Sequence, residues 1–116
     1  MPETPVIDRA TFTELQDNAG ADFVAELVDT FGEEAPPLID ELRAAFAGRG
    51  SDCAAERFRR AAHSLKSNSS TFGATRLAEL ARTLELGGMP ADAAPLSEIA
   101  AEFARTLAAL RKAARG

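Results

Sequence analysis

Apolar side chains recur every three or four residues along most of this chain, as expected of helices that bury one face. Glycines, prolines and capping residues divide the pattern into five segments. The first should be a short helix of about ten residues, capped by Asp8 and ending near residues 18–20. The last should cover roughly residues 92–114. Its inward residues are expected to be Leu96, Ile99, Phe103, Leu107 and Leu110.

The second segment begins at Gly20 or Asp22 and keeps helical spacing for about 25 residues, although Pro36-Pro37 interrupts it. A proline inside a helix removes a backbone donor and clashes with the preceding turn, at a cost of about 3 kcal/mol. Because the periodicity continues beyond the prolines, we predict a kinked helix or two coaxial pieces. The inward residues are expected to be Phe23, Leu27, Phe31, Leu38, Leu42 and Phe46.

The third segment follows residues 48–50, whose two glycines should end the second helix. We expect Ser51 or Asp52 to cap the third helix, because their side-chain oxygens can accept hydrogen bonds from the free backbone donors of its first turn. This helix should end near Phe72, with Gly73 as the residue that stops it.

The fourth segment covers residues 74–86 and ends at Gly87-Gly88 and Pro90. Four substantial helices with short Gly-containing connections predict an all-α fold, an antiparallel up-down four-helix bundle with a short extra N-terminal helix. In the fourth helix the inward residues should be Leu77, Leu80, Ala81 and Leu84.

The 116 residues are expected to form one domain, residues 1–116, in which residues 1–7 are an extended lead with two prolines. No apolar run reaches the roughly 18 residues of a membrane span, and the chain does not begin with a basic and then an apolar stretch. We therefore expect neither a membrane span nor a signal peptide, and a cytoplasmic monomer without a membrane partner.

The formal charge of −5 is distributed unevenly along the chain. Residues 1–56 hold 13 acidic and 3 basic side chains, whereas residues 57–116 hold 5 acidic and 10 basic ones. Because an acidic chain is a poor ligand for nucleic acid, we expect no nucleic-acid partner. The basic half surrounds the only histidine, which suits an acidic, phosphorylated partner.

That histidine, His63, is predicted to be exposed on the third helix. At about 100° per residue, the apolar residues of this helix fall about 160–220° away from His63. These residues are Ala54, Phe58, Ala61, Leu65 and Phe72. A lone histidine on a helix is often only a solvated residue or a member of the core, and the helical wheel excludes the core.

The residues that share the face of His63 are cationic or small. Arg59 and Lys66, one turn before and one turn after it, could support the charge of a phosphoryl group on His63. Ser67 and Ser70 have small side chains, so another protein's backbone can come close to the helix surface there. An exposed imidazole is largely neutral at cellular pH, so one ring nitrogen has a lone pair and can act as a nucleophile.

The sequence indicates no ATP site, no cofactor and no metal of its own. It contains no Gly-rich phosphate loop or Walker motif, so phosphate would have to come from another protein. Haem and di-metal bundles need several inward His or Glu ligands, and one cysteine with one histidine provides too few ligands for a metal site. We interpret Cys53 as structural.

Residues 63–74 resemble the signature of histidine-containing phosphotransfer (HPt) domains. The sequence His63-x-Leu65-Lys66-Ser67-x-Ser69-x-x-x-Gly73-Ala74 is similar to the family pattern His-x-Leu-Lys-Gly-Ser-Ser-x-x-x-Gly-Ala. The resemblance implies an up-down helical bundle in which His63 accepts a phosphoryl group from a receiver-domain aspartate or from a kinase, such as a hybrid sensor histidine kinase. It further implies that His63 passes the group to the aspartate of a response regulator.

The resemblance also suggests roles for neighbouring residues. Lys66 matches the phosphate-assisting lysine of the family, and Glu85 falls where many members have a Gln or Glu that can hydrogen-bond the histidine. Ser67 stands where the family usually has Gly. Magnesium is expected only in the partner receiver domain.

Two alternatives remain open at this point. The chain could be a helical adaptor module that only binds receiver domains and is not phosphorylated, or a purely structural bundle, although the presence of both His63 and Lys66 favours a phosphocarrier. Among phosphocarriers, it could be the phosphate-accepting domain of a chemotaxis-type kinase, but such domains are normally followed by much longer chains. In none of these cases is the domain an autonomous kinase.

Overall fold

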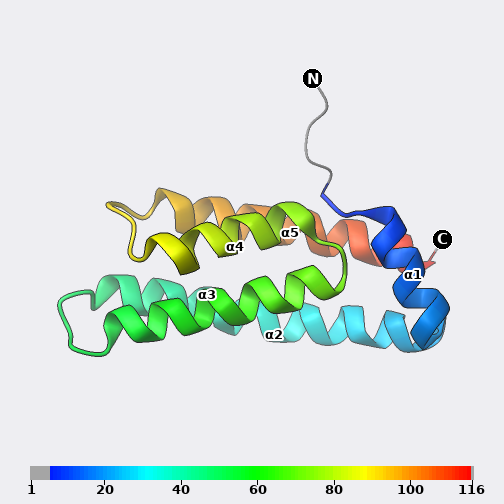
Figure 1. The fold of residues 1–116 in the computed structure, drawn as a ribbon, viewed down its shortest axis with the longest axis horizontal. Coiled ribbons are helices and arrows are strands. Elements are labelled where there is room, and N and C mark those ends of the chain that lie inside the picture. Colours follow the sequence, from blue (N-terminus) through cyan, green and yellow to red (C-terminus); the bar gives the residue numbers. More distant parts are fainter. Residues whose placement is uncertain (1–5, 116) are drawn as a thin grey trace, which may run out of the picture.

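The computed structural model describes residues 6–115, and these form five helices and no strand. Four long helices run up and down in antiparallel order, and a short helix, α1, crosses one end of the bundle (Figure 1). The all-α prediction is confirmed, whereas most of the predicted extended lead, residues 1–7, lies outside the described residues. The helices are α1 (Arg9–Ala19), α2 (Ala21–Ala47), α3 (Ala54–Thr71), α4 (Thr75–Gly87) and α5 (Ala94–Arg115).

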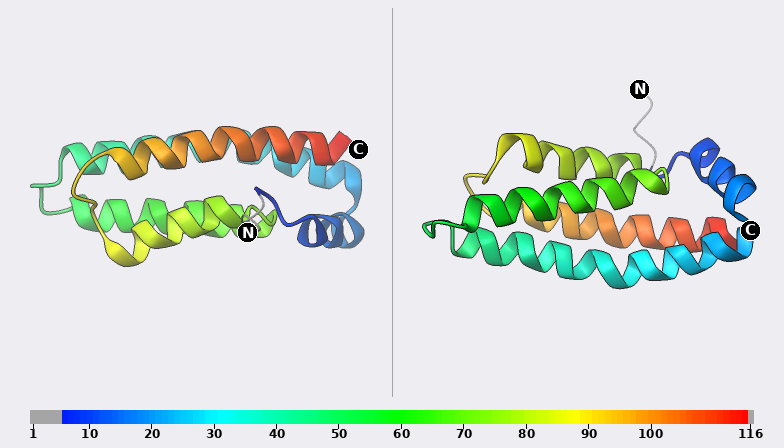
Figure 2. Two further views of the ribbon diagram at one scale, coloured as in Figure 1. Left: turned by 90° about the horizontal axis from the view of Figure 1, so that it is seen from above. Right: turned by 60° about the horizontal axis from the view of Figure 1, so that its bottom comes forward.

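The four long helices close a ring around one core. Helices α2 and α4 each pack against both α3 and α5, so α2 and α4 occupy opposite corners (Figure 2). Every helix contributes a fully buried side chain to this core, among them Phe12, Leu42, Phe58, Leu77 and Ile99. Because each helix has a polar outer face, none of the described helices combines the length and the hydropathy needed to cross a membrane.

Helix α1 is tied to the turn between α3 and α4. Asp8 caps α1 as predicted: its carboxylate accepts hydrogen bonds from the Ala10 backbone N–H at 3.2 Å and from the Thr11 hydroxyl at 2.7 Å. The Asp8 backbone N–H donates to the Gly73 carbonyl at 2.6 Å. Phe12, which is 1% exposed, then anchors the helix in the core.

Helix α2 runs without a break through Pro36-Pro37, so two coaxial pieces do not form, and Figure 2 shows the helix bowed. The predicted inward stripe is wrong at Phe23, which is 52% exposed, because the neighbouring Val24 faces the core instead. Smaller residues let α5 come close: a Cβ added to Gly32 would lie 3.3 Å from the Leu107 methyl groups. The buried residues of α2 are Val24, Val28, Phe31, Ala35, Ile39, Leu42 and Ala45, whereas the predicted Leu27, Leu38 and Phe46 are half-buried.

The start of α3 differs from the prediction, because neither Ser51 nor Asp52 caps it. The Ser51 carbonyl accepts a hydrogen bond from the Ala54 backbone N–H at 3.3 Å, so this stretch forms a turn and the helix begins only at Ala54. Cys53 takes the N-cap position without a side-chain hydrogen bond. Its side chain is free and exposed, so Cys53 is not part of the core.

The end of α3 explains why Gly and Ala follow the helix. The Ala74 backbone N–H donates to the Ser69 carbonyl at 2.9 Å, and the Gly73 N–H donates to the Ser70 carbonyl at 3.1 Å. These two hydrogen bonds form a Schellman motif, which requires a left-handed residue after the helix. Gly73 supplies it with φ of +75°. The predicted end near Phe72 is confirmed.

Helix α4 begins and ends within one residue of its predicted bounds and places Leu77, Ala81 and Leu84 in the core as expected. The fourth predicted residue, Leu80, is only half-buried. Gly88, with φ of +75°, follows the helix at its C-terminal end. The connection then leads to α5, which begins two residues later than predicted.

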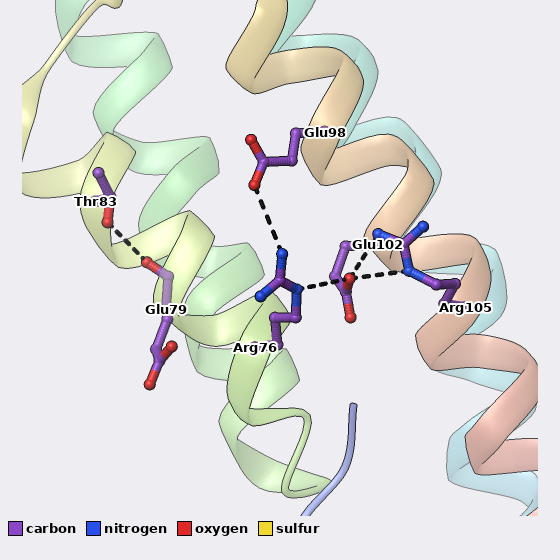
Figure 3. A network of polar contacts seen from close by, with 6 residues as sticks. All are labelled: Arg76, Glu79, Thr83, Glu98, Glu102 and Arg105. Atoms are coloured by element: carbon purple, nitrogen blue, oxygen red, sulfur yellow. Dashed lines mark hydrogen bonds and ion pairs between the residues drawn. The ribbon is translucent and has the colours of Figure 1, made fainter. Parts of the chain in front are cut away.

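Helix α5 turns a charged residue toward the interior, which the apolar pattern did not predict. Glu102 is 0% exposed, whereas the predicted Phe103 and Leu107 are half-buried. Its Oε1 atom accepts hydrogen bonds from Arg76 Nε at 3.1 Å and from Arg105 Nη2 at 2.8 Å (Figure 3). Two guanidinium groups thus compensate a carboxylate that would be costly to bury alone. The network ties α5 to the first turn of α4.

The turn at Gly73 yields a stability prediction with an internal control. Alanine at either Gly73 or Gly88 is strained by a positive φ, at a cost of about 1–3 kcal/mol. Only at Gly73 would the new Cβ also collide with α1, at 2.9 Å from both the Asp8 carbonyl oxygen and Thr11 Cβ. We expect Gly73→Ala to lower the free energy of unfolding by about 1–3 kcal/mol more than Gly88→Ala does. Equal losses in urea denaturation would show that α1 is not held closely against this turn.

Candidate functional site

His63 lies in the middle of α3 with its side chain 55% exposed, as the helical wheel predicts. The adjacent Ala62 and Leu65 are 0% exposed and fix which face of α3 turns to the core. The imidazole is therefore left at the surface on the side of α3 that borders α4.

Glu85 of α4 contacts the imidazole of His63 at Nδ1. Its Oε2 atom lies 2.6 Å from His63 Nδ1, and its side chain is only 13% exposed. The pKa of Glu85 is lowered, first by its hydrogen bond to Lys66 and next by that to His63. The carboxylate is therefore ionised at neutral pH and can only accept a hydrogen bond. A neutral imidazole must then donate its Nδ1–H, which leaves the lone pair on Nε2.

Lys66 holds the other oxygen of the same carboxylate. Its Nζ atom lies 2.8 Å from Glu85 Oε1, and its side chain is 29% exposed. Because Lys66 follows His63 by one helical turn, both residues reach the same carboxylate from one face of α3. Glu85 is thus oriented between an ammonium group and an imidazole, and the structure brings together three of the six residues that the sequence singled out.

Arg59, one helical turn before His63, is paired with a carboxylate of its own helix. Its Nη2 atom lies 2.7 Å from Glu56 Oε1 on the preceding turn, and Glu56 also holds Arg60 at 3.4 Å. The hydrogen bond to Glu56 raises the pKa of Arg59 and lowers that of Glu56. Arg59 thus has a carboxylate partner within α3, which it shares with Arg60.

The two serines are exposed, as expected, and neither hydroxyl bonds to the His63 ring among the described residues. Ser70 lines a groove of about 250 Å³ between α3 and α4, and Ser67 does not. Lys66 belongs to the lining of this groove, so the groove adjoins the contact between His63 and Glu85. Its main lining residues are Thr11, Lys66, Ser70, Ala78, Glu79 and Arg82.

Sequence reasoning missed Arg82 and Thr11 as residues of this surface. Arg82 precedes Glu85 by three residues, so helical spacing alone could have placed both on one side of α4. No sequence signal could have found Thr11, because its position depends on how α1 packs against the turn at Gly73.

The arrangement can present one unprotonated nitrogen to a partner and stabilise positive charge on the ring. The Glu85 carboxylate faces Nδ1 across 2.6 Å, so in a neutral ring Nε2 has the lone pair and could act as a nucleophile. Residues 6–115 contain no cluster of three or more His, Cys, Asp or Glu side chains that could hold a metal ion.

The lowered pKa of Glu85 predicts a pH dependence of stability. A carboxyl group whose pKa is lower in the folded than in the unfolded chain stabilises the fold above its unfolded pKa, and this contribution is lost as the pH falls through the folded pKa. We expect the difference in unfolding free energy between the parent and Glu85→Gln to be constant near neutral pH. It should shrink below the usual pKa range of a glutamate.

Urea denaturation between about pH 7 and pH 3 measures this difference. In a Lys66→Met background the difference should be smaller at neutral pH, because Lys66 is the largest cause of the lowered pKa. A difference that does not change with pH would contradict the ionised contact.

The chain was compared with known proteins. A family model described as Hpt domain matches residues 26–113. The matched stretch contains His63, Lys66 and Glu85 but leaves out α1 and the first five residues of α2. No curated protein and no solved structure is significantly similar to the chain.

Proposed function

The chain belongs to the Hpt domain family, whose members are phosphotransfer modules of two-component systems, and on this basis we propose that it is a phosphocarrier of a phosphorelay. His63 accepts a phosphoryl group from the aspartate of a receiver domain or from a histidine kinase. It then passes the group to the aspartate of a response regulator. The contact between Glu85 and His63 Nδ1 at 2.6 Å is the observation that carries this proposal.

The proposed transfer is a substitution at phosphorus. The lone pair of His63 Nε2 attacks the phosphorus of an aspartyl phosphate, so that a P–N bond forms. The P–O bond to the aspartate breaks, and the aspartate carboxylate leaves with the electron pair. The imidazole becomes positively charged as the P–N bond forms, and the Glu85 carboxylate beside Nδ1 stabilises this charge. The same steps in reverse deliver the phosphoryl group to the next aspartate.

Lys66 has a second task in this proposal besides orienting Glu85. Its ammonium group has three donor hydrogens, so it can hold the carboxylate with one and face a phosphoryl oxygen with another. Phosphoryl transfer depends mainly on positioning and charge stabilisation, which a lysine at this distance can supply. The partner supplies the remaining machinery: Hpt domains carry phosphate without an ATP site of their own, and magnesium belongs to the receiver.

We expect His63→Gln to abolish phosphate acceptance from a phosphorylated receiver while it changes the free energy of unfolding by no more than about 1 kcal/mol. The side chain is 55% exposed and supports no part of the core. Radiolabel transfer followed by acid and alkali treatment measures the acceptance, because phosphohistidine is labile in acid and stable in alkali. Ser64→Ala, an exposed neighbour on the same helix, serves as the control and should accept label normally.

Acid-labile label on His63→Gln would exclude His63 as the acceptor. If the parent protein bound receivers without taking any label from them, the chain would be an adaptor module and not a phosphocarrier.

A further inference from the structure

We propose that the groove between α3 and α4 seats the anionic rim around the phosphorylated aspartate of a receiver domain, and that Arg82 and Thr11 in this groove determine which receivers exchange phosphate with the chain. This inference rests on the proposed function. It concerns residues that neither the phosphotransfer motif nor the contact between His63 and Glu85 includes.

The position of the groove follows from a shared residue. Lys66 is one of the lining residues of the groove, and its ammonium group pairs with the Glu85 carboxylate. Glu85 in turn contacts His63. The groove therefore begins one helical turn from His63, at Lys66, so a partner seated in it would also cover the face of α3 that carries the imidazole.

The charge of Arg82 is available to such a partner. Lys66 is paired with Glu85 and Arg59 with Glu56, so two of the cations near His63 already have carboxylate partners. Arg82 is exposed and makes no ion pair with any residue of the range 6–115. Glu79 is the one acidic side chain among the lining residues. The rim of a phosphorylated aspartate is strongly anionic, and an exposed guanidinium can bind its oxygens through two parallel donors.

Thr11 contributes part of the groove wall from α1. The family match begins at residue 26, so α1 lies outside it, yet Thr11 of α1 closes one end of the groove. The wall is fixed in place, because the Thr11 hydroxyl donates to Asp8 at 2.7 Å and Asp8 donates its backbone N–H to Gly73 at 2.6 Å. A fixed wall beside an open phosphate site excludes partners whose surface does not match, which is a means of specificity.

The experiment compares two phosphate donors, of which only the first has to dock on the surface of the protein. The first is a purified receiver domain loaded with acetyl phosphate, at a concentration below saturation. The second is phosphoramidate, a small donor from which His63 Nε2 takes the phosphoryl group with release of ammonia. The variants are Arg82→Glu and Thr11→Arg. Arg115→Glu on α5 is the control, because it reverses an exposed arginine that lines a different groove.

With the receiver, we expect Arg82→Glu to slow transfer by about tenfold or more, because reversing a charge at a docking surface lowers the association rate. The slowing should weaken as salt is added, since salt screens exposed charges. With phosphoramidate, Arg82→Glu and the parent should be labelled at equal rates. Arg115→Glu should match the parent with both donors, and Thr11→Arg should slow some receivers of a panel more than others.

The inference is overturned if Arg82→Glu equals the parent with every receiver tried, or if it slows phosphoramidate and the receiver equally. The second result would place Arg82 in the chemistry at His63 instead of in docking. Thermal unfolding shows whether Thr11→Arg is folded. If this variant does not fold, the transfer rates of Arg82→Glu still test the inference. Failure of the proposed function looks different: in that case label remains on His63→Gln, whatever happens at Arg82.

Discussion

The turn between α3 and α4 is the constraint on which the site depends. Gly73 reverses the chain with a positive φ that a Schellman motif requires, and α4 therefore returns antiparallel and directly against α3. A separation of 22 residues between His63 and Glu85 becomes a contact of 2.6 Å. The same glycine leaves the space in which Asp8 and Thr11 pack, so one residue fixes both the site and the helix beside it.

Two cations near His63, Lys66 and Arg59, are paired with neighbouring carboxylates. The basic half of the sequence suggested a field of free positive charge, but Lys66 is held by Glu85 and Arg59 by Glu56. The pairing with Lys66 lowers the pKa of Glu85 and orients its carboxylate, and an ionised Glu85 in turn assigns the proton of a neutral imidazole to Nδ1. The contacts of the site thus converge on one oriented carboxylate, that of Glu85.

Much of the fold could be predicted from helical spacing and from the residues that stop helices. The exposed position of His63 followed from the large residues opposite it, Phe58 and Leu65, which leave no choice of face. The predicted inward face of α2 was wrong at its start, where Val24 and not the bulkier Phe23 faces the core, because helical spacing alone does not choose between two adjacent apolar residues. An inward Glu102 could not be predicted, because its burial depends on Arg76 from another helix.

The most direct test of this account is nitrogen NMR of the imidazole ring before and after phosphorylation. The chain contains a single histidine, so its ring signals need no assignment among competitors. In the neutral form of the ring we expect the proton on Nδ1 and the lone pair on Nε2, and we expect phosphorus coupling to Nε2 once the phosphoryl group is bound. A proton on Nε2 in the neutral ring, or a phosphoryl group on Nδ1, would contradict this account.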